Sequence, residues 1–273
     1  MQRSRGARLL QIGSHLAAAK ASRPGDAEPR HLISVELTRR DKPTSDGSAQ
    51  PVRQTVEHWV PHQTAVIVCD MWNLHHCLNA TRRGIELCPT MERMLTALRA
   101  NGVTVIHAPS GCMRTYAETA ARRRAQDAPA AAVLPEGIDE WQHTSAGEPP
   151  TTGTHEGEQG AEADGCVPGG YPIDQRASEE DDDPTEHAAW ARQLIAAGQR
   201  ADAPWTRQTS ALTVDQRVDF ISDSGSEIWN VLTARGLTNV LMCGVHTNMC
   251  VLGRPFGLRQ LARLGIKVAS HGP

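Results

Sequence analysis

The sequence predicts an α/β fold built on a mainly parallel sheet. Three apolar runs, at residues 64–69, 103–108 and 240–243, have the length and composition of buried strands. Amphipathic segments lie between them, and the first of these ends at Asn101-Gly102, a helix stop signal. Such alternation of strands and helices is typical of βαβ units in a parallel sheet.

The first of these units is expected between residues 64 and 108. The run at residues 64–69 ends in Asp70, and a loop is expected from there to Pro89. Thr90 can then cap a helix that runs to Asn101.

The second half of the chain repeats this alternation. A short strand is expected at residues 218–222, and Ser226 can cap a helix that ends at Gly236. The strand at residues 240–243 follows, and a last strand is expected at residues 266–269. A helix with Cys250 in its first turn is expected between these two strands.

The segment around Cys250 is the most informative part of the chain. An apolar strand ends at Gly244, and a tight turn at residues 245–249 delivers the cysteine to a helix start. The positive end of a helix favours thiolate over thiol, so Cys250 is predisposed to act as a nucleophile. The alternative is that Cys250 is a small buried apolar residue, as many free cysteines are.

Asp70 decides between these interpretations of Cys250. Both residues follow strands that are expected to be parallel, and the carboxyl ends of parallel strands meet along one edge where ligands bind. The fold therefore predicts a carboxylate close to a thiol.

Two regions lie outside the regular pattern. Residues 1–61 form a polar N-terminal extension with one strand expected at residues 32–37, and the main domain spans residues 62–273. Residues 129–204 read as a low-complexity insertion, rich in Gly, Pro, Thr, Glu and Asp, with a helix expected at residues 186–197.

Composition bears on the class of partner and on the cellular compartment. The net charge of the 273 residues is −3, which gives no case for nucleic acid or an anionic membrane as partner. No apolar run approaches the length of a membrane-spanning helix. The seven cysteines have no framework spacing, which favours free thiols in a reducing compartment, with a Cys112–Cys166 bridge as an alternative. A cytoplasmic location is expected, although the basic N-terminus loosely resembles a signal peptide and leaves export open.

Two motifs together resemble the isochorismatase-like cysteine hydrolases, a family that includes nicotinamidases, N-carbamoyl amide hydrolases and isochorismatases. They are VIVCDM, which contains Asp70, and CGVHTNMCV, which contains Cys250. The match covers residues 63–109 and 219–269. The resemblance implies a three-layer α/β/α sandwich around a Rossmann-like sheet, and a homo-oligomer.

The resemblance also implies roles for individual residues. Asp70 corresponds to the general base that deprotonates the thiol, and Cys250 to the nucleophile that attacks an amide carbon. The family places a cis peptide bond at the position of Val245–His246. In that geometry the N–H groups of His246 and Cys250 point to one place and form an oxyanion hole.

The family's catalytic lysine has no counterpart here. The chain contains only Lys20, Lys42 and Lys267, and none falls at the family position near the strand at residues 218–222. Arg217 is the nearest cation by alignment, and Arg207 is a looser candidate. Either Arg217 supplies the positive charge beside Asp70 and Cys250, or the triad is incomplete. A guanidinium supplies charge in a fork geometry, but it does not carry a proton.

A metal site is the second departure from the family. Nicotinamidases bind a divalent ion through an aspartate and histidines after the second strand, and residues 107–112 do not offer that set. His75 and His76 are alternative ligands, but adjacent histidines on a loop point in different directions, so packing at the pocket wall is favoured. No cofactor is predicted, and a divalent metal stays open. Besides Asp70 and Cys250, the pocket is expected to contain Trp72, His75, His246 and Thr247.

The function expected from these residues is hydrolysis of a small amide, carbamoyl or ester substrate through the Cys250 thiolate. The alternative is a catalytically impaired member that keeps the pocket for binding or assembly, because the lysine is missing. Vinyl-ether hydrolysis of the isochorismatase kind is less favoured, since the lysine takes part in it. Family members continue beyond the position of Pro273, so a truncated C-terminus is also expected.

Overall fold

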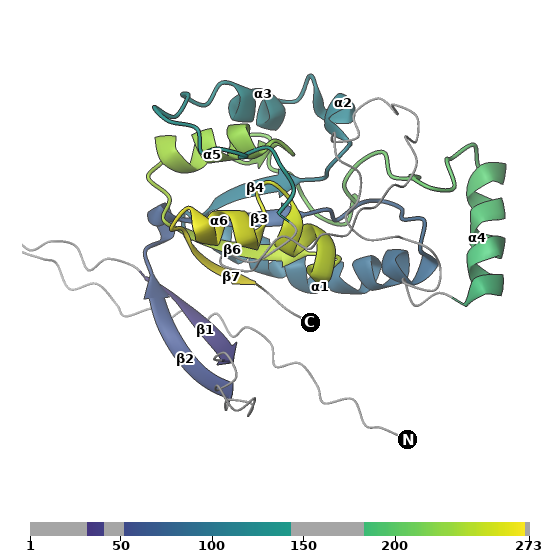
Figure 1. The fold of residues 1–273 in the computed structure, drawn as a ribbon, viewed down its shortest axis with the longest axis horizontal. Coiled ribbons are helices and arrows are strands. Elements are labelled where there is room, and N and C mark those ends of the chain that lie inside the picture. The colour runs from purple at the N-terminus through teal and green to yellow at the C-terminus, as the bar shows by residue number, and fades with distance from the viewer. Residues whose placement is uncertain (1–31, 41–51, 143–182, 271–273) are drawn as a thin grey trace, which may run out of the picture.

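A five-stranded sheet forms the centre of the molecule (Figure 1). The structure is a computed structural model, and it describes residues 32–40, 52–142 and 183–270. The strand order is β5-β4-β3-β6-β7, and every neighbouring pair is parallel, so the predicted parallel sheet is confirmed. The strands are β3 (Thr64–Cys69), β4 (Thr104–Ala108), β5 (Phe220–Ile221), β6 (Asn239–Gly244) and β7 (Lys267–Ser270).

Helices cover both faces of this sheet and make three layers. On one face lies α1 (Leu78–Ala100); on the other lie α3 (Ala120–Gln126), α5 (Gly225–Ala234) and α6 (Leu258–Arg263) (Figure 1). The α/β/α sandwich is therefore confirmed. The remaining helices are α2 (Met113–Tyr116) and α4 (Pro184–Ala196).

Strand β3 shows why the central strands read as continuous apolar runs. Successive side chains of a strand point to opposite faces. Ile67 packs in the cluster that contains α5, whereas Val66 and Val68 pack in the cluster that contains α1. Every residue of β3 is buried, because helices cover both faces of the strand. A strand in this position is therefore composed almost entirely of apolar residues.

Helix α1 begins earlier than the sequence predicted. The expected start after Thr90 is wrong, because the helix starts at Leu78 and runs through Pro89. Its first turn is capped by Cys77, whose Sγ accepts a hydrogen bond from the Ala80 N–H at 3.3 Å. Proline removes one helix hydrogen bond, but the buried face of α1 continues on both sides of Pro89, and that packing keeps the chain helical.

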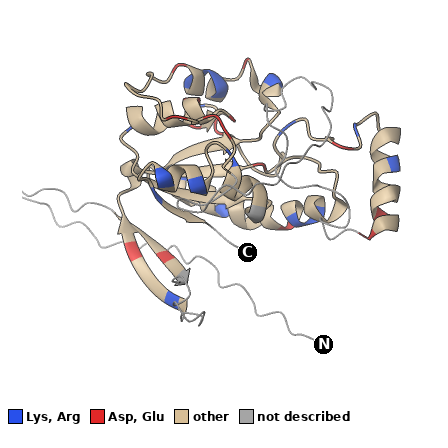
Figure 2. Cartoon of the chain, in the orientation of Figure 1, with Lys and Arg blue, Asp and Glu red and all other residues tan. Residues whose placement is uncertain are grey.

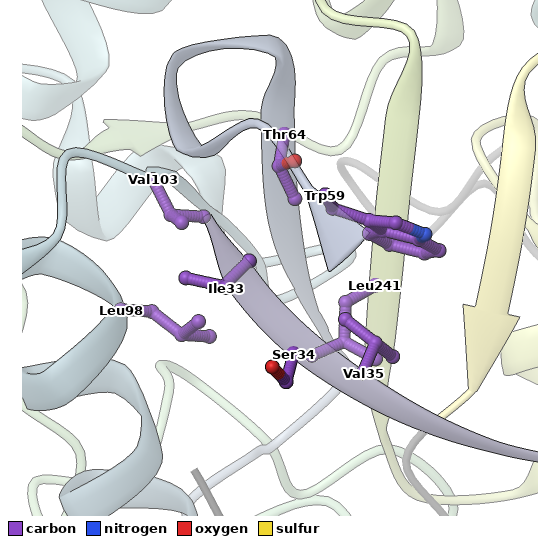
Figure 3. A pocket seen from close by; sticks show the side chains of 8 residues that line it. All are labelled: Ile33, Ser34, Val35, Trp59, Thr64, Leu98, Val103 and Leu241. Atoms are coloured by element: carbon purple, nitrogen blue, oxygen red, sulfur yellow. The ribbon is translucent and has the colours of Figure 1, made fainter. Parts of the chain in front are cut away.

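A β-hairpin from the N-terminal extension packs against the domain. Its strands are β1 (Ile33–Arg40) and β2 (Val52–Trp59), and they pair antiparallel. Ile33, Val35 and Trp59 are buried beside Leu98, Val103 and Leu241, around a cavity of about 10 Å³ (Figure 3). The extension thus contributes side chains to the core, and the strand expected at residues 32–37 is present.

The other predicted elements differ from the structure mainly at their ends. Helix α5 is capped by Ser224, two residues before the expected cap, and the Ser224 Oγ accepts from the Glu227 N–H at 3.2 Å. The helix expected in the insertion is present as α4, capped by Asp183. Residues 143–182, including Cys166, lie outside the described part of the chain.

Charged residues of both signs are distributed over the described elements (Figure 2). None of the helices that the structure describes is long and apolar enough to cross a lipid bilayer.

Candidate active site

Four neighbouring strands deliver polar residues to one edge of the sheet. Asp70 directly follows β3, Ser110 lies two residues after β4, and Asp223 lies two residues after β5. Cys250 follows β6 through a short turn. This is the carboxyl edge of the parallel strands, where ligands bind in α/β proteins.

Asp70 is held by two hydrogen bonds in a fully buried position. Its Oδ1 accepts from the Ser110 N–H at 2.9 Å, and its Oδ2 accepts from the Arg254 Nε at 2.8 Å. The backbone of Asp70 has a φ of 50°, in the left-handed region. Such a conformation is uncommon outside glycine and occurs often at functional sites.

Cys250 lies beside this carboxylate, as the topology predicted. It belongs to η3 (Thr247–Val251), a single π-helical turn, and is completely buried. The charges of Asp70 and Arg254 both act on its thiol. The three side chains thus form one cluster at the edge of the sheet.

The ionisation of Cys250 differs from the expectation. Burial raises the pKa of the thiol well above its ordinary value, Asp70 raises it further, and Arg254 opposes them. The expected lowering by a helix N-terminus is wrong for this site, because η3 is one short turn and the sulfur is removed from water. The resting thiol is therefore neutral, and its proton must pass to a neighbouring base before it can attack.

Arg254 is the cation of the site, and sequence reasoning missed it. Its guanidinium carbon lies 4.6 Å from the centroid of the Trp141 ring and 5.9 Å from that of Trp72. A Cβ at Gly253 would lie 2.9 Å from the Trp141 ring, so glycine there leaves room for this tryptophan. The Arg254 N–H donates to the Cys250 carbonyl at 3.1 Å, which ties the two residues together one helical turn apart.

Arg217 is not brought to the site. Its side chain is 87% exposed, and its Nε and Nη2 bind the carboxylate of Asp215 at 3.0 and 2.8 Å. The assignment of Arg217 as the cation is therefore corrected to Arg254. Alignment to the family lysine pointed to the strand before Ser222, whereas the charge comes from the segment after Cys250.

Tryptophans form one wall of the site. Trp72 stacks on Trp205 with ring centroids 4.4 Å apart and 11° between the ring planes. Its Nε1 donates to the Ser110 carbonyl at 3.0 Å. Trp205 belongs to a segment that lies along residues 71–73, where the Thr209 N–H donates to the Met71 carbonyl at 2.8 Å. The segment that directly follows the insertion thus contributes to the site.

Three histidines pack together next to this wall. The ring of His75 lies 4.0 Å from that of His76 and 4.5 Å from that of His246. Burial, together with these two neighbours, lowers the pKa of His75 well below its ordinary value, so its imidazole is neutral. The described residues contain no group of three or more His, Cys, Asp and Glu placed to hold one metal ion.

The turn before Cys250 differs from the family geometry in one respect. The peptide bonds of the described residues are all trans, so the cis bond expected at Val245–His246 is wrong. The chain turns through His246, whose φ is 60°. Gly244 is required before it, because a Cβ there would lie 2.0 Å from the Cys69 carbonyl oxygen. Thr247, expected in the pocket, is exposed.

The cavity at the site is small. Its volume is about 10 Å³, which is room for about one water molecule. Its lining includes Asp70, Trp72, His75, Thr81, Val245 and His246. Cys250 and Arg254 are not among the residues that line it. A wider cavity of about 550 Å³ lies at β5 between α3 and α5 and contains none of these residues.

Comparisons with known proteins give a likeness to a solved structure and no match of sequence. No family model matches the chain. No curated protein matches it either. The crystal structure of a cysteine hydrolase from Pseudomonas syringae pv. phaseolicola 1448A is similar over 77% of this chain and 70% of that one, with 17% identity and a TM-score of 0.36. So low a score leaves the chemistry to be inferred from the residues of this chain.

Proposed function

We propose that the chain is an isochorismatase-like cysteine hydrolase that cleaves a small amide, carbamoyl or ester substrate through Cys250. The observation that carries this proposal is the buried cluster of Cys250, Asp70 and Arg254 at the carboxyl edge of the sheet. Thiol, carboxylate and cation in contact are the groups that nucleophilic catalysis by cysteine needs.

In the first step Asp70 removes the proton of the Cys250 thiol. The sulfur then attacks the carbonyl carbon of the substrate, and the C–S bond forms as the carbonyl becomes an oxyanion. Asp70 returns the proton to the leaving group, and the bond to that group breaks. Water, deprotonated by Asp70, then hydrolyses the thioester and releases the acid and the free thiol.

Arg254 stabilises the charges of this sequence without moving a proton. Its guanidinium stays protonated throughout, so its contact with Asp70 and Cys250 favours the thiolate and the carboxylate alike. Asp70 is then the sole proton carrier of the cluster.

A binding or assembly protein is the second candidate. One observation favours it: burial raises the pKa of the Cys250 thiol well above its ordinary value. In that case the cluster would serve stability alone. The two candidates differ in whether removing the thiol abolishes a reaction.

The test is the release of ammonia or acid from a panel of small compounds. Acetamide, benzamide, nicotinamide and N-carbamoylglycine serve as substrates. The methyl esters of acetic, benzoic and nicotinic acid complete the panel. The expected result is turnover by the native protein, and loss of that turnover in Cys250→Ala and Asp70→Asn. Cys243→Ala is the matched control, because Cys243 is equally buried but packs on the face of the sheet that α1 covers. Full turnover in Cys250→Ala would contradict the proposal.

A further inference from the structure

Ser110 carries a buried hydroxyl that the fold does not use. The residue is 2% exposed, and its Oγ has no hydrogen-bond partner among the described residues. Its backbone is fully used: the N–H donates to Asp70, and the carbonyl accepts from Trp72 and from the Cys112 thiol. Buried polar groups are nearly always paired, because an unpaired one keeps its desolvation cost. An unpaired hydroxyl at the site therefore points to a ligand.

The position of this hydroxyl relates it to the proton carrier. The Ser110 N–H binds Oδ1 of Asp70 at 2.9 Å, whereas Arg254 binds Oδ2 at 2.8 Å. In the proposed reaction the leaving group must approach Asp70 to receive the proton that came from Cys250. The backbone of Ser110 is fixed to the carboxylate that carries this proton.

The surroundings of Ser110 favour a ligand that donates hydrogen bonds. The next residue, Gly111, gives its N–H to Oδ2 of Asp223 at 2.8 Å, which places a second carboxyl group beside this segment. Asp70 and Asp223 are close enough for their charges to interact. A neighbourhood of two carboxyl groups attracts an N–H group and disfavours a carbonyl oxygen.

We infer that the Ser110 hydroxyl binds the leaving nitrogen of the substrate. Its Oγ accepts a hydrogen bond from an N–H of that nitrogen while Asp70 delivers the proton that came from Cys250. This inference rests on the proposed function and narrows it to substrates with an N–H leaving group. The C–S bond to Cys250 forms, the C–N bond breaks, and the nitrogen departs as ammonia or an amine with the proton from the thiol. An ester has no N–H at that position and gains nothing from Ser110.

The test compares amide and ester turnover in Ser110→Ala. Each amide of the panel that is turned over is paired with the methyl ester of the same acid. We expect kcat/KM for the amide to fall about 10-fold or more, as for one lost hydrogen bond to the reacting group, and that for the ester to fall less than about 3-fold. Ser34→Ala, which removes a hydroxyl in the hairpin, is the control and should change neither value.

Thermal unfolding separates this role from a structural one. If Ser110 Oγ is free until substrate binds, Ser110→Ala should keep or raise the Tm, because an unpaired buried hydroxyl is lost. A Tm lowered by about 2–4 °C, as expected for a hydroxyl bonded within the fold, would overturn the inference. Equal losses for amide and ester would overturn it too, and would leave the proposed function intact if Cys250→Ala is inactive. Turnover that persists in Cys250→Ala would instead remove the proposed function itself.

Discussion

The Nε of Arg254 donates to Oδ2 of Asp70 at 2.8 Å, and the two side chains are 3% and 0% exposed. Such a pair is expensive to break, since removal of one partner leaves a buried charge without compensation. In the proposed reaction, Arg254 also supplies the positive charge beside Cys250. Under that proposal, stability and catalysis depend on the same contact.

Removal of Arg254 should cost far more than removal of Arg217. Arg254→Ala is expected to lower the free energy of unfolding by about 3–5 kcal/mol and to abolish turnover, because Asp70 is left unpaired. Arg217→Ala breaks an ion pair in which the arginine is 87% exposed, so about 0–1 kcal/mol and unchanged turnover are expected. Urea unfolding and the panel assay measure both variants.

A double-substitution cycle serves as the control for the Arg254 result. Asp70→Asn combined with Arg254→Ala should lose less stability than the sum of the single changes, because the second change no longer strands a charge. Additive losses, or equal effects of Arg217→Ala and Arg254→Ala, would refute the assignment of Arg254.

The raised thiol pKa predicts how Cys250 responds to pH. Alkylation by iodoacetamide, located by peptide mass spectrometry, should be slow at pH 7 and accelerate only above the ordinary cysteine pKa of about 8.5. An alkylation rate that reaches its plateau below pH 8 would show that the pKa of Cys250 is lowered, and it would contradict a buried, neutral thiol.

The raised pKa of the Cys250 thiol also predicts a loss of stability at alkaline pH. Above about pH 8.5 the unfolded chain releases the Cys250 proton while the folded chain retains it, so the free energy of unfolding falls as pH rises. Urea unfolding at pH 8 and pH 10 should show a smaller decline in Cys250→Ala than in the native protein. An identical decline in the two proteins would mean that this thiol does not contribute.

His75 predicts the opposite trend in acid. Its folded-state pKa is lowered, so below about pH 6.5 the unfolded chain takes up a proton that the folded chain refuses. Stability should therefore fall as pH drops from about 6.5 toward the folded-state pKa. His75→Asn should flatten this decline, whereas His62→Asn, at an exposed residue, should not. Urea unfolding midpoints between pH 5 and pH 7 measure this decline in stability. The same dependence on pH in both variants would refute the role of His75.

The hairpin should prove to be part of the stable domain. Trp59 is 2% exposed and packs among the residues of Figure 3, so Trp59→Ala is expected to lower the free energy of unfolding by about 3–5 kcal/mol. Val56, also on β2, is 57% exposed, and Val56→Ala should change it by less than about 0.5 kcal/mol. Similar values for the two variants would mean that the hairpin does not pack on the core in solution.

The sheet and several residues at its carboxyl edge could be predicted from the sequence. Apolar runs buried on both faces identify β3, β4 and β6, and parallel strands place Asp70 and Cys250 at one edge. The residues that could not be predicted depend on contacts between distant segments. Arg254 reads as a polar position after Cys250, and it becomes buried because Trp141 and Trp72 cover its guanidinium.

Helix α1 and the insertion illustrate the same limit. Pro89 indicates a helix boundary in the sequence, whereas packing of the buried α1 face overrides it. Trp205 follows a segment of low-complexity composition, and only its stacking on Trp72 identifies it as part of the site. For Ser110 a weak signal existed, since it lies just after a strand that ends at the same edge as Asp70.

The most direct test of the account is the mass of the protein caught during turnover. A reaction with the best amide of the panel, quenched in acid within one turnover, should give a protein heavier by the acyl group. Peptide mapping should place that group on Cys250, and Cys250→Ala should not gain it. Turnover without a covalent adduct, or an adduct on another residue, would contradict a thiol nucleophile at this position.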